Sequence, residues 1–322
     1  MDISTLFSVI LHGQYKEEMA SVDYRHVDVE NYGSIPATEC KDEDDDDDDS
    51  YNVAVYKNTT ERLLLLFKLS FPVILAFLLS VSGNCIVLYF AGFISRTRGE
   101  NVTFGGISLA TTFTNITLTS IVDGLTTAVE TLSSQYNGAK NYRMVGLVLN
   151  RSIIVMLLMA APLLLSWLYF DEIFTAIGVD QDMRLVIGRF LVVRVLSVPV
   201  EIVYLCYEKF LMSMGIMQPS LQACFLCNLC LACLCYVFVV ILEWNVEGIA
   251  LAFALSMIIE LTALVVFSYT IPSVRRAMVK VDGQSCRGLL TFLCFGLAGC
   301  VMLCAEWWAY VSRLSVCSLC VV

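Results

Sequence analysis

The residues of this chain that could do chemistry are ionisable side chains placed inside long apolar stretches. Asp123 and Glu130 lie in one such stretch, Glu201 and Glu208 lie in another, and Glu260 lies in a third. An ionised group inside an apolar layer is costly, and it usually faces a cavity or an opposite charge. These acids are therefore candidates for a polar cavity or for internal ion pairs.

The spacing of the acids predicts which of them share a surface. Glu201 and Glu208 are seven residues apart, so they lie on one face of a helix. Arg194 lies in the same stretch and could neutralise one of the acids, although the sequence does not say which. Glu130 and Gln135 lie close to the end of their stretch, where a solvated or helix-capping role is an equally good interpretation.

Four cysteines recur every three residues: Cys224, Cys227, Cys230 and Cys233. In a soluble chain such spacing would suggest a zinc or redox site. On a helix, however, residues three apart drift round the surface and do not converge on one ion, so small-residue packing is the better interpretation. The chain also lacks a phosphate-binding loop, a nucleophile elbow and an HExxH motif. We predict no enzyme activity, no cofactor and no metal site.

Composition indicates the environment in which these residues work. Of 322 residues, 58% are hydrophobic and 16% are charged, against about 25% charged in soluble domains. A soluble domain cannot bury so much apolar surface, whereas a bilayer can cover it. We therefore predict an all-α integral membrane protein.

The net charge of -10 is concentrated at the amino terminus. Residues 1–60 contain 15 acids and 4 bases, including the run Lys41–Ser50, whereas the remainder contains 15 acids and 16 bases. Such a run repels itself and predicts a disordered tail, which is either simply solvated or a partner-binding arm. The absence of a basic face argues against nucleic-acid binding.

Seven apolar segments are long enough to cross a bilayer, for which about 20 residues suffice. Prolines inside them predict kinks at Pro72, Pro162 and Pro199, while Pro219 and Pro272 are expected near helix ends. The segments are 63–93, 103–131, 145–170, 186–212, 219–242, 248–271 and 289–311.

The loops between these segments differ in basic charge. The second, fourth and sixth loops carry more lysine and arginine than the first, third and fifth, so we expect them to be cytoplasmic. The amino terminus is then cytoplasmic, in a multi-pass protein that we expect in the plasma or vacuolar membrane. The bases of the even-numbered loops and their edges are Lys140, Arg143, Lys209, Arg275, Arg276, Lys280 and Arg287.

Five stretches of the chain carry recognisable motifs: Asn115–Ser152, Gly178–Leu191, Val198–Ser220, Glu247–Ser256 and Ala305–Tyr310. In residues and in order, they resemble the motifs of the multidrug and toxic compound extrusion (MATE) family. Relative to the family pattern, Glu130 replaces a common Asp and Asn150 replaces a Gln. Several motifs in the right order are far more specific than any one of them alone.

The resemblance implies a fold and a set of domains. The family fold is an inverted V-shaped transporter of twelve helices in two six-helix lobes, with the substrate cavity between them. We expect a disordered acidic tail at 1–60, a six-helix amino-terminal lobe at 61–275, a linker with helix seven at 276–312, and an atypical tail at 313–322. The last segment does not resemble the family's continuation, so we expect either a truncated chain or a half-transporter that pairs with a second lobe or a second copy.

The resemblance also implies a function, secondary active export of organic, often cationic, compounds in exchange for protons. By residue match, Glu306 of the Glu-Trp-Trp motif is the proton-coupling residue, because desolvation raises a carboxylate's affinity for a proton. Trp307 and Trp308 could bind an organic cation through their ring faces, or could instead form an interfacial belt. The other substrate-cavity candidates are Asn115, Glu130, Gln135, Glu201, Tyr207 and Glu260.

The chain differs from bacterial members of the family in helix one, and two other functions remain open. The resemblance places a cation site of bacterial relatives in the stretch Ser80–Gly92 of helix one, which contains no acid and only Asn84 as a strongly polar residue, so that site is expected to be absent. The first alternative function is that of a lipid-linked glycan flippase, which shares the broad architecture. The second is a non-transporting membrane protein whose acidic tail binds partners.

Overall fold

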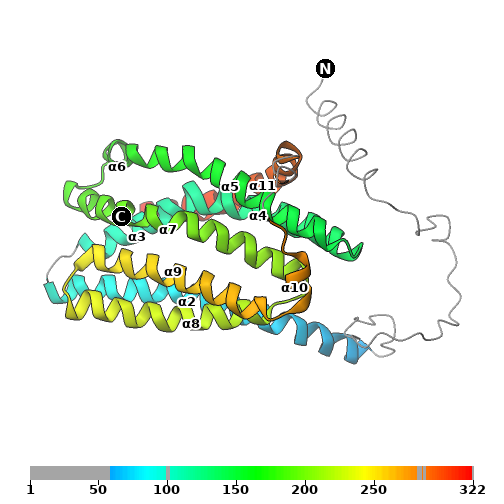
Figure 1. The fold of residues 1–322 in the computed structure, drawn as a ribbon. Helices are drawn as coiled ribbons and strands as arrows, with labels where there is room; N and C mark the ends of the chain where they lie inside the picture. The colour runs from blue at the N-terminus through cyan, green and yellow to red at the C-terminus, as the bar shows by residue number, and fades with distance from the viewer. Residues whose placement is uncertain (1–58, 99–101, 281–284, 286–287, 321–322) are drawn as a thin grey trace, which may run out of the picture. The chain divides into compact units, whose positions relative to one another are not determined.

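The computed structural model describes residues 59–98, 102–280, 285 and 288–320, which are mainly helical (Figure 1). The chain divides into two compact units, Met1–Phe67 and Lys68–Val322. The helices and helical turns are α2 (Thr59–Arg98), α3 (Val102–Thr114), η2 (Asn115–Thr119), α4 (Ser120–Gly138), α5 (Tyr142–Ser166), η3 (Trp167–Tyr169), α6 (Phe170–Ile177), α7 (Gln181–Ser213), α8 (Gln218–Cys235), η4 (Tyr236–Ile241), α9 (Asn245–Tyr269), α10 (Pro272–Ala277) and α11 (Leu289–Cys320).

All seven predicted segments are helical. α2, α7, α9 and α11 each correspond to one segment, whereas the second, third and fifth segments are built from α3–η2–α4, α5–η3–α6 and α8–η4. Within the described residues, five stretches are long and apolar enough to cross a membrane by length and composition. These are Val73–Thr97, Tyr142–Ile177, Gln218–Ile241, Asn245–Tyr269 and Phe292–Ala309.

The second and fourth segments are not among these five stretches. α3 and η2 are rich in threonine, and α7 contains Arg194, Glu201, Glu208 and Lys209. Residues of both segments line a polar cavity inside the lobe. Helices that line a polar cavity carry such residues at a cost in hydropathy.

Local signals determine several helix ends. Pro219 and Pro272 occupy the first turns of α8 and α10, as predicted, because the first turn needs no N–H from them. Asn141 caps α5 by accepting a hydrogen bond from the Met144 amide at 3.3 Å. Gly178 ends α6 with a φ of 86°, a left-handed conformation that glycine adopts at little cost.

The lobe is built around α4, α7 and α9. α9 packs against α7 and α8, while α4 packs against α5, α7 and α11 (Figure 1). α2 contacts α8 through Asn228, whose side-chain amide donates to the Leu79 carbonyl at 3.0 Å and whose carbonyl oxygen accepts from Ser82 at 3.2 Å. Fully buried side chains at the helix contacts include Ile94, Ile107, Phe210, Ile249 and Leu264.

The hydroxyl groups of the second segment mostly satisfy their own helix. Thr114 and Thr117 donate to the carbonyls four residues earlier, at 2.9 Å and 2.7 Å. Thr117 also accepts from the Trp167 indole at 2.9 Å, which ties η2 to η3. Such back-bonding lets a threonine-rich helix pack without unsatisfied hydroxyls.

Glycines bring α4 and α11 into close contact, and we refer to this contact as the glycine seam. A Cβ on Gly299 would lie 2.6 Å from the Gly124 carbonyl oxygen and would also collide with the Thr127 hydroxyl. A Cβ on Gly296 would lie 2.7 Å from Leu125 Cδ2. Small residues permit this approach of two backbones, which larger side chains would prevent.

The tails predicted at the two chain ends, 1–60 and 313–322, have different outcomes. Almost all of the predicted acidic tail at 1–60 lies outside the described residues. At the other end α11 continues to Cys320, so most of the segment predicted as an atypical tail prolongs the helix.

Candidate functional site

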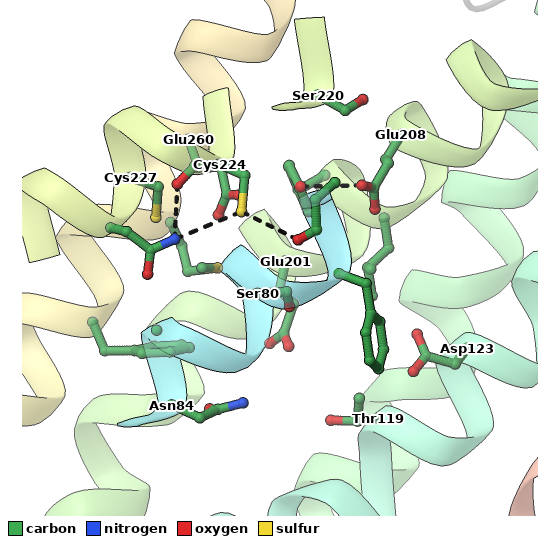
Figure 2. A pocket seen from close by; sticks show the side chains of 18 of the residues that line it. Ser80, Asn84, Thr119, Asp123, Glu201, Glu208, Ser220, Cys224, Cys227 and Glu260 are labelled. Carbon is green, nitrogen blue, oxygen red and sulfur yellow. Dashed lines mark hydrogen bonds between the residues drawn. The ribbon is translucent and has the colours of Figure 1, made fainter. Parts of the chain in front are cut away.

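A cavity of about 390 Å³ lies inside the unit that begins at Lys68 (Figure 2). Its volume falls at the lower end of the range typical of small-molecule sites. The walls come from α2, α3, η2, α4, α7, α8 and α9. The polar and ionisable side chains that line it include Ser80, Asn84, Asn115, Thr119, Asp123, Arg194, Glu201, Tyr204, Glu208, Lys209, Ser220, Asn228 and Glu260.

Four carboxylates line this cavity, and they come from three helices. α4 supplies Asp123, α7 supplies Glu201 and Glu208, and α9 supplies Glu260 (Figure 2). Glu201 and Glu208, seven residues apart on one face of α7, both line this cavity. Glu260 is the most enclosed of the four at 4% exposed.

Arg194 is the buried cation of the cavity wall. Its guanidinium bonds to the Glu201 carboxylate at 2.7 Å and to the Ser197 hydroxyl. The same guanidinium lies over the ring of Phe253, 4.6 Å from the ring centroid. These contacts hold Arg194 in place, so it serves as a fixed counter-ion for Glu201.

Lys209 is the second cation of the lining, and its partner lies outside the cavity. The ammonium bonds to the Glu130 carboxylate at 2.6 Å, and the two side chains are 26% and 40% exposed. This ion pair joins α7 to α4. Lys209 lines the same cavity as Asp123 and Glu208, without forming an ion pair with either among the described residues.

Three carboxylates of the lining are left without a cation. None of Asp123, Glu208 and Glu260 forms an ion pair with a lysine or arginine in the described part of the chain. Glu208 accepts a hydrogen bond of 3.4 Å from the Tyr204 hydroxyl, which is a neutral donor. Uncompensated carboxylates at this depth are costly unless they take up a proton or a cation. The arrangement therefore suits positively charged ligands.

The polar residues of α2 and α8 were only partly anticipated. Asn84 was singled out as the polar residue of helix one, and it does line the cavity (Figure 2). Asn228 and Ser220 of α8 also line it, but no spacing in the sequence distinguished them. The acids that line the cavity come from α4, α7 and α9.

The cysteine row faces in several directions. Cys224 and Cys227 line the cavity, whereas Cys230 is half-buried and Cys233 is exposed. Two of the four cysteines therefore share the cavity wall, while the other two lie progressively farther round α8. In the part of the chain that the structure describes, no group of His, Cys, Asp and Glu is arranged to hold a metal ion.

Of the predicted cavity residues, Asn115, Glu201 and Glu260 line this cavity, whereas Glu130, Gln135 and Tyr207 do not. The Glu130 side chain turns to Lys209, and Gln135 is exposed near the end of α4. Tyr207 faces α9, where its hydroxyl lies 2.7 Å from the Ser268 hydroxyl. It lies one residue from Glu208 and six from Glu201, so its side chain points roughly 100–120° away from both acids around α7.

The Glu-Trp-Trp motif lies on α11, away from this cavity. Glu306 and Trp308 are exposed, and Trp307 is half-buried. None of the three lines the cavity. Their predicted coupling and binding roles therefore concern a different surface, the outward face of α11.

Comparison with known proteins places this geometry in context. The family model described as MatE matches residues 72–237. Human "Multidrug and toxin extrusion protein 1" is 30% identical over 254 residues, covering 78% of this chain and 43% of that protein. "Protein DETOXIFICATION 48" of Arabidopsis thaliana is 29% identical over 252 residues, covering 78% of this chain and 46% of that protein.

A solved structure shares the fold. The crystal structure of the eukaryotic MATE transporter AtDTX14 superposes with a TM-score of 0.71 at 23% identity, covering 78% of this chain and 56% of that one. The chain thus spans about half the length of the relatives that it matches.

Proposed function

Because the chain belongs to the MATE family of multi-pass membrane transporters, we propose that it contributes to the export of organic cations in exchange for protons. The observation that carries this proposal is the cavity with more carboxylates than cations. An organic cation and protons both neutralise carboxylates, so they compete for the same groups. Such competition is the simplest basis for exchange.

The cavity fits the substrate half of this exchange. It is lined by apolar side chains, such as Val73, Phe77 and Met257, together with the acids. Apolar walls with a few placed polar groups are typical of sites for small organic molecules. Organic cations that present both an apolar body and a charge match this lining.

Glu306 is proposed to carry the proton in this exchange. Its exposed position on α11, the first helix of the second lobe, leaves its carboxylate available to further helices of that lobe, supplied by the same polypeptide or by another copy. Packing of such a lobe would desolvate Glu306 and so favour its protonated form. Trp307 and Trp308 would then border the contact, with their ring faces available to a cation.

The proposal also gives an orientation. The bases of the even-numbered loops place them in the cytoplasm, and with them the amino terminus. The acidic tail is then cytoplasmic, and substrate leaves the cytoplasm across a plasma or vacuolar membrane.

Proton coupling can be tested with the full chain in proteoliposomes. An acidic interior should drive uptake of radiolabelled tetraethylammonium, and collapsing the pH gradient with an ionophore should abolish that uptake. Uptake that is unaffected by the gradient, or absent with it, would refute the proposed exchange.

The role of Glu306 requires a matched pair of variants. Glu306→Gln removes the proton carrier and should reduce gradient-driven uptake to the level of empty liposomes. Glu172→Gln removes an exposed acid on α6, away from the cavity, and should leave uptake unchanged. Equal uptake by the two variants would show that Glu306 does not couple the proton.

A further inference from the structure

We propose that the cavity binds an organic dication, a molecule with two separated ammonium groups, more tightly than a monocation of the same size. This inference rests on the proposed function, since it takes the cavity to be the site of an organic cation. It goes further by specifying the charge of that ligand.

The first argument is the number of carboxylates. The count includes the four carboxylates of the lining and Glu130, which lies beside it. Arg194 pairs with Glu201, and Lys209 pairs with Glu130. Three carboxylates, Asp123, Glu208 and Glu260, remain. One ammonium group neutralises at most one of them, so a ligand with a single charge leaves two for protons to neutralise. A dication leaves only one.

The second argument is the placement of these three acids. They project from α4, α7 and α9, which form different walls of the cavity (Figure 2). No metal-binding group forms among the described residues. A compact divalent ion therefore cannot use these acids together, because its ligands must converge within about 2.0–2.6 Å of one centre. A flexible molecule with separated charges can reach two of the walls.

The third argument is an unused hydroxyl at the cavity wall. Ser220 is 4% exposed and lines the cavity (Figure 2). Its oxygen has no hydrogen-bond partner among the described residues. A buried hydroxyl without a partner is costly. An ammonium group carries three N–H donors, so one that binds a carboxylate still has donors for such an oxygen.

The existing cations do not serve as the missing partners. Arg194 is held by Glu201, Ser197 and Phe253, and Lys209 by Glu130. Moving either to one of the free acids would leave another carboxylate unpaired. The charge deficit is therefore a property of the whole cavity, and a ligand must supply the compensation.

The test compares two amines with the same four-carbon chain, putrescine with two charges and butylamine with one. Their binding to the purified full chain in lipid nanodiscs is measured by titration calorimetry. Putrescine should bind about ten- to a hundredfold more tightly, the factor of one added charge-assisted hydrogen bond. Equal affinities, or no binding of either amine, would overturn the proposal. Magnesium ions should not displace putrescine, and displacement at equal concentration would overturn it in favour of a metal site.

Variants locate the effect within the cavity. Glu208→Gln and Glu260→Gln should each bring putrescine affinity close to that of butylamine, while Glu172→Gln on α6 should keep the wild-type ratio. A ratio unchanged in both cavity variants would refute the assignment. If these variants fail to fold, the affinities of putrescine and butylamine for the wild-type chain still decide whether the cavity prefers a dication.

The two proposals fail in different ways. Loss of the putrescine preference with intact, gradient-driven tetraethylammonium uptake would refute the dication site alone. A putrescine preference without gradient-driven uptake would refute proton exchange while leaving the binding site supported.

Discussion

Replacing Arg194 with methionine should destabilise the lobe far more than its single charge suggests. The substitution removes the 2.7 Å ion pair with Glu201 and the contact with the Phe253 ring. Breaking one side of a buried ion pair costs about 3–5 kcal/mol, because the remaining charge stays buried. The Glu201 side chain is 16% exposed and lines the cavity, so we expect the lower end of that range, about 3 kcal/mol.

A double-mutant cycle separates this pairing from general damage to packing. The free energy of unfolding is measured in mixed micelles for Arg194→Met, Glu201→Met and the double variant. Replacement of both partners by apolar residues of similar size is often neutral, so the double variant should recover most of the loss. The expected coupling energy is about 2–3 kcal/mol, near the upper end for residues in contact.

Two results would refute this reasoning. If Arg194→Met costs less than about 1 kcal/mol, the pair behaves like an exposed one and the cavity wall is wetter than its burial indicates. If the double variant loses the sum of the two single losses, Arg194 and Glu201 stabilise the lobe independently.

Three further predictions use the same unfolding measurement. Gly299→Ala should lower the free energy of unfolding by about 1–3 kcal/mol, because the added methyl group does not fit in the glycine seam. An unchanged free energy of unfolding would mean that α4 and α11 can move apart at no cost. Tyr207→Phe should cost about 1 kcal/mol through loss of the 2.7 Å contact with Ser268, and a larger loss would indicate a role beyond this hydrogen bond. Lys209→Met should change stability by no more than about 1 kcal/mol, since its partner Glu130 is 40% exposed, and a loss as large as that of Arg194→Met would contradict the exposure.

The fold was largely predictable because long apolar segments are typical of helices that are surrounded by lipid. Seven long apolar segments predicted seven helical segments, and Pro219 and Pro272 predicted the starts of α8 and α10. The family resemblance was confirmed by the match to residues 72–237. Hydropathy gives no sign of the π-helical turn η2, because the register of backbone hydrogen bonds does not alter composition.

The candidate site was predictable only in part. Acids in apolar segments stand out, and Glu201 and Glu260 were identified in this way. The pairing of Arg194 with Glu201 was left open, since residues seven apart share a helix face but a long side chain can also reach a neighbouring helix. Ser220 and Asn228 lie in the cavity because α8 turns one face toward α2 and α9, and single polar residues do not reveal which face that is.

The glycine seam has a consequence for the rate of conformational change. Interlocked side chains must change rotamer before one helix can advance along another, which raises the activation barrier. At the glycine seam, Gly124, Gly296 and Gly299 contribute no side chain of their own, so only the partner helix's side chains, such as Thr127 and Leu125, project into the contact. Shear between these helices would therefore encounter few steric steps, so α11 could shift along the amino-terminal lobe rapidly while remaining in contact with it.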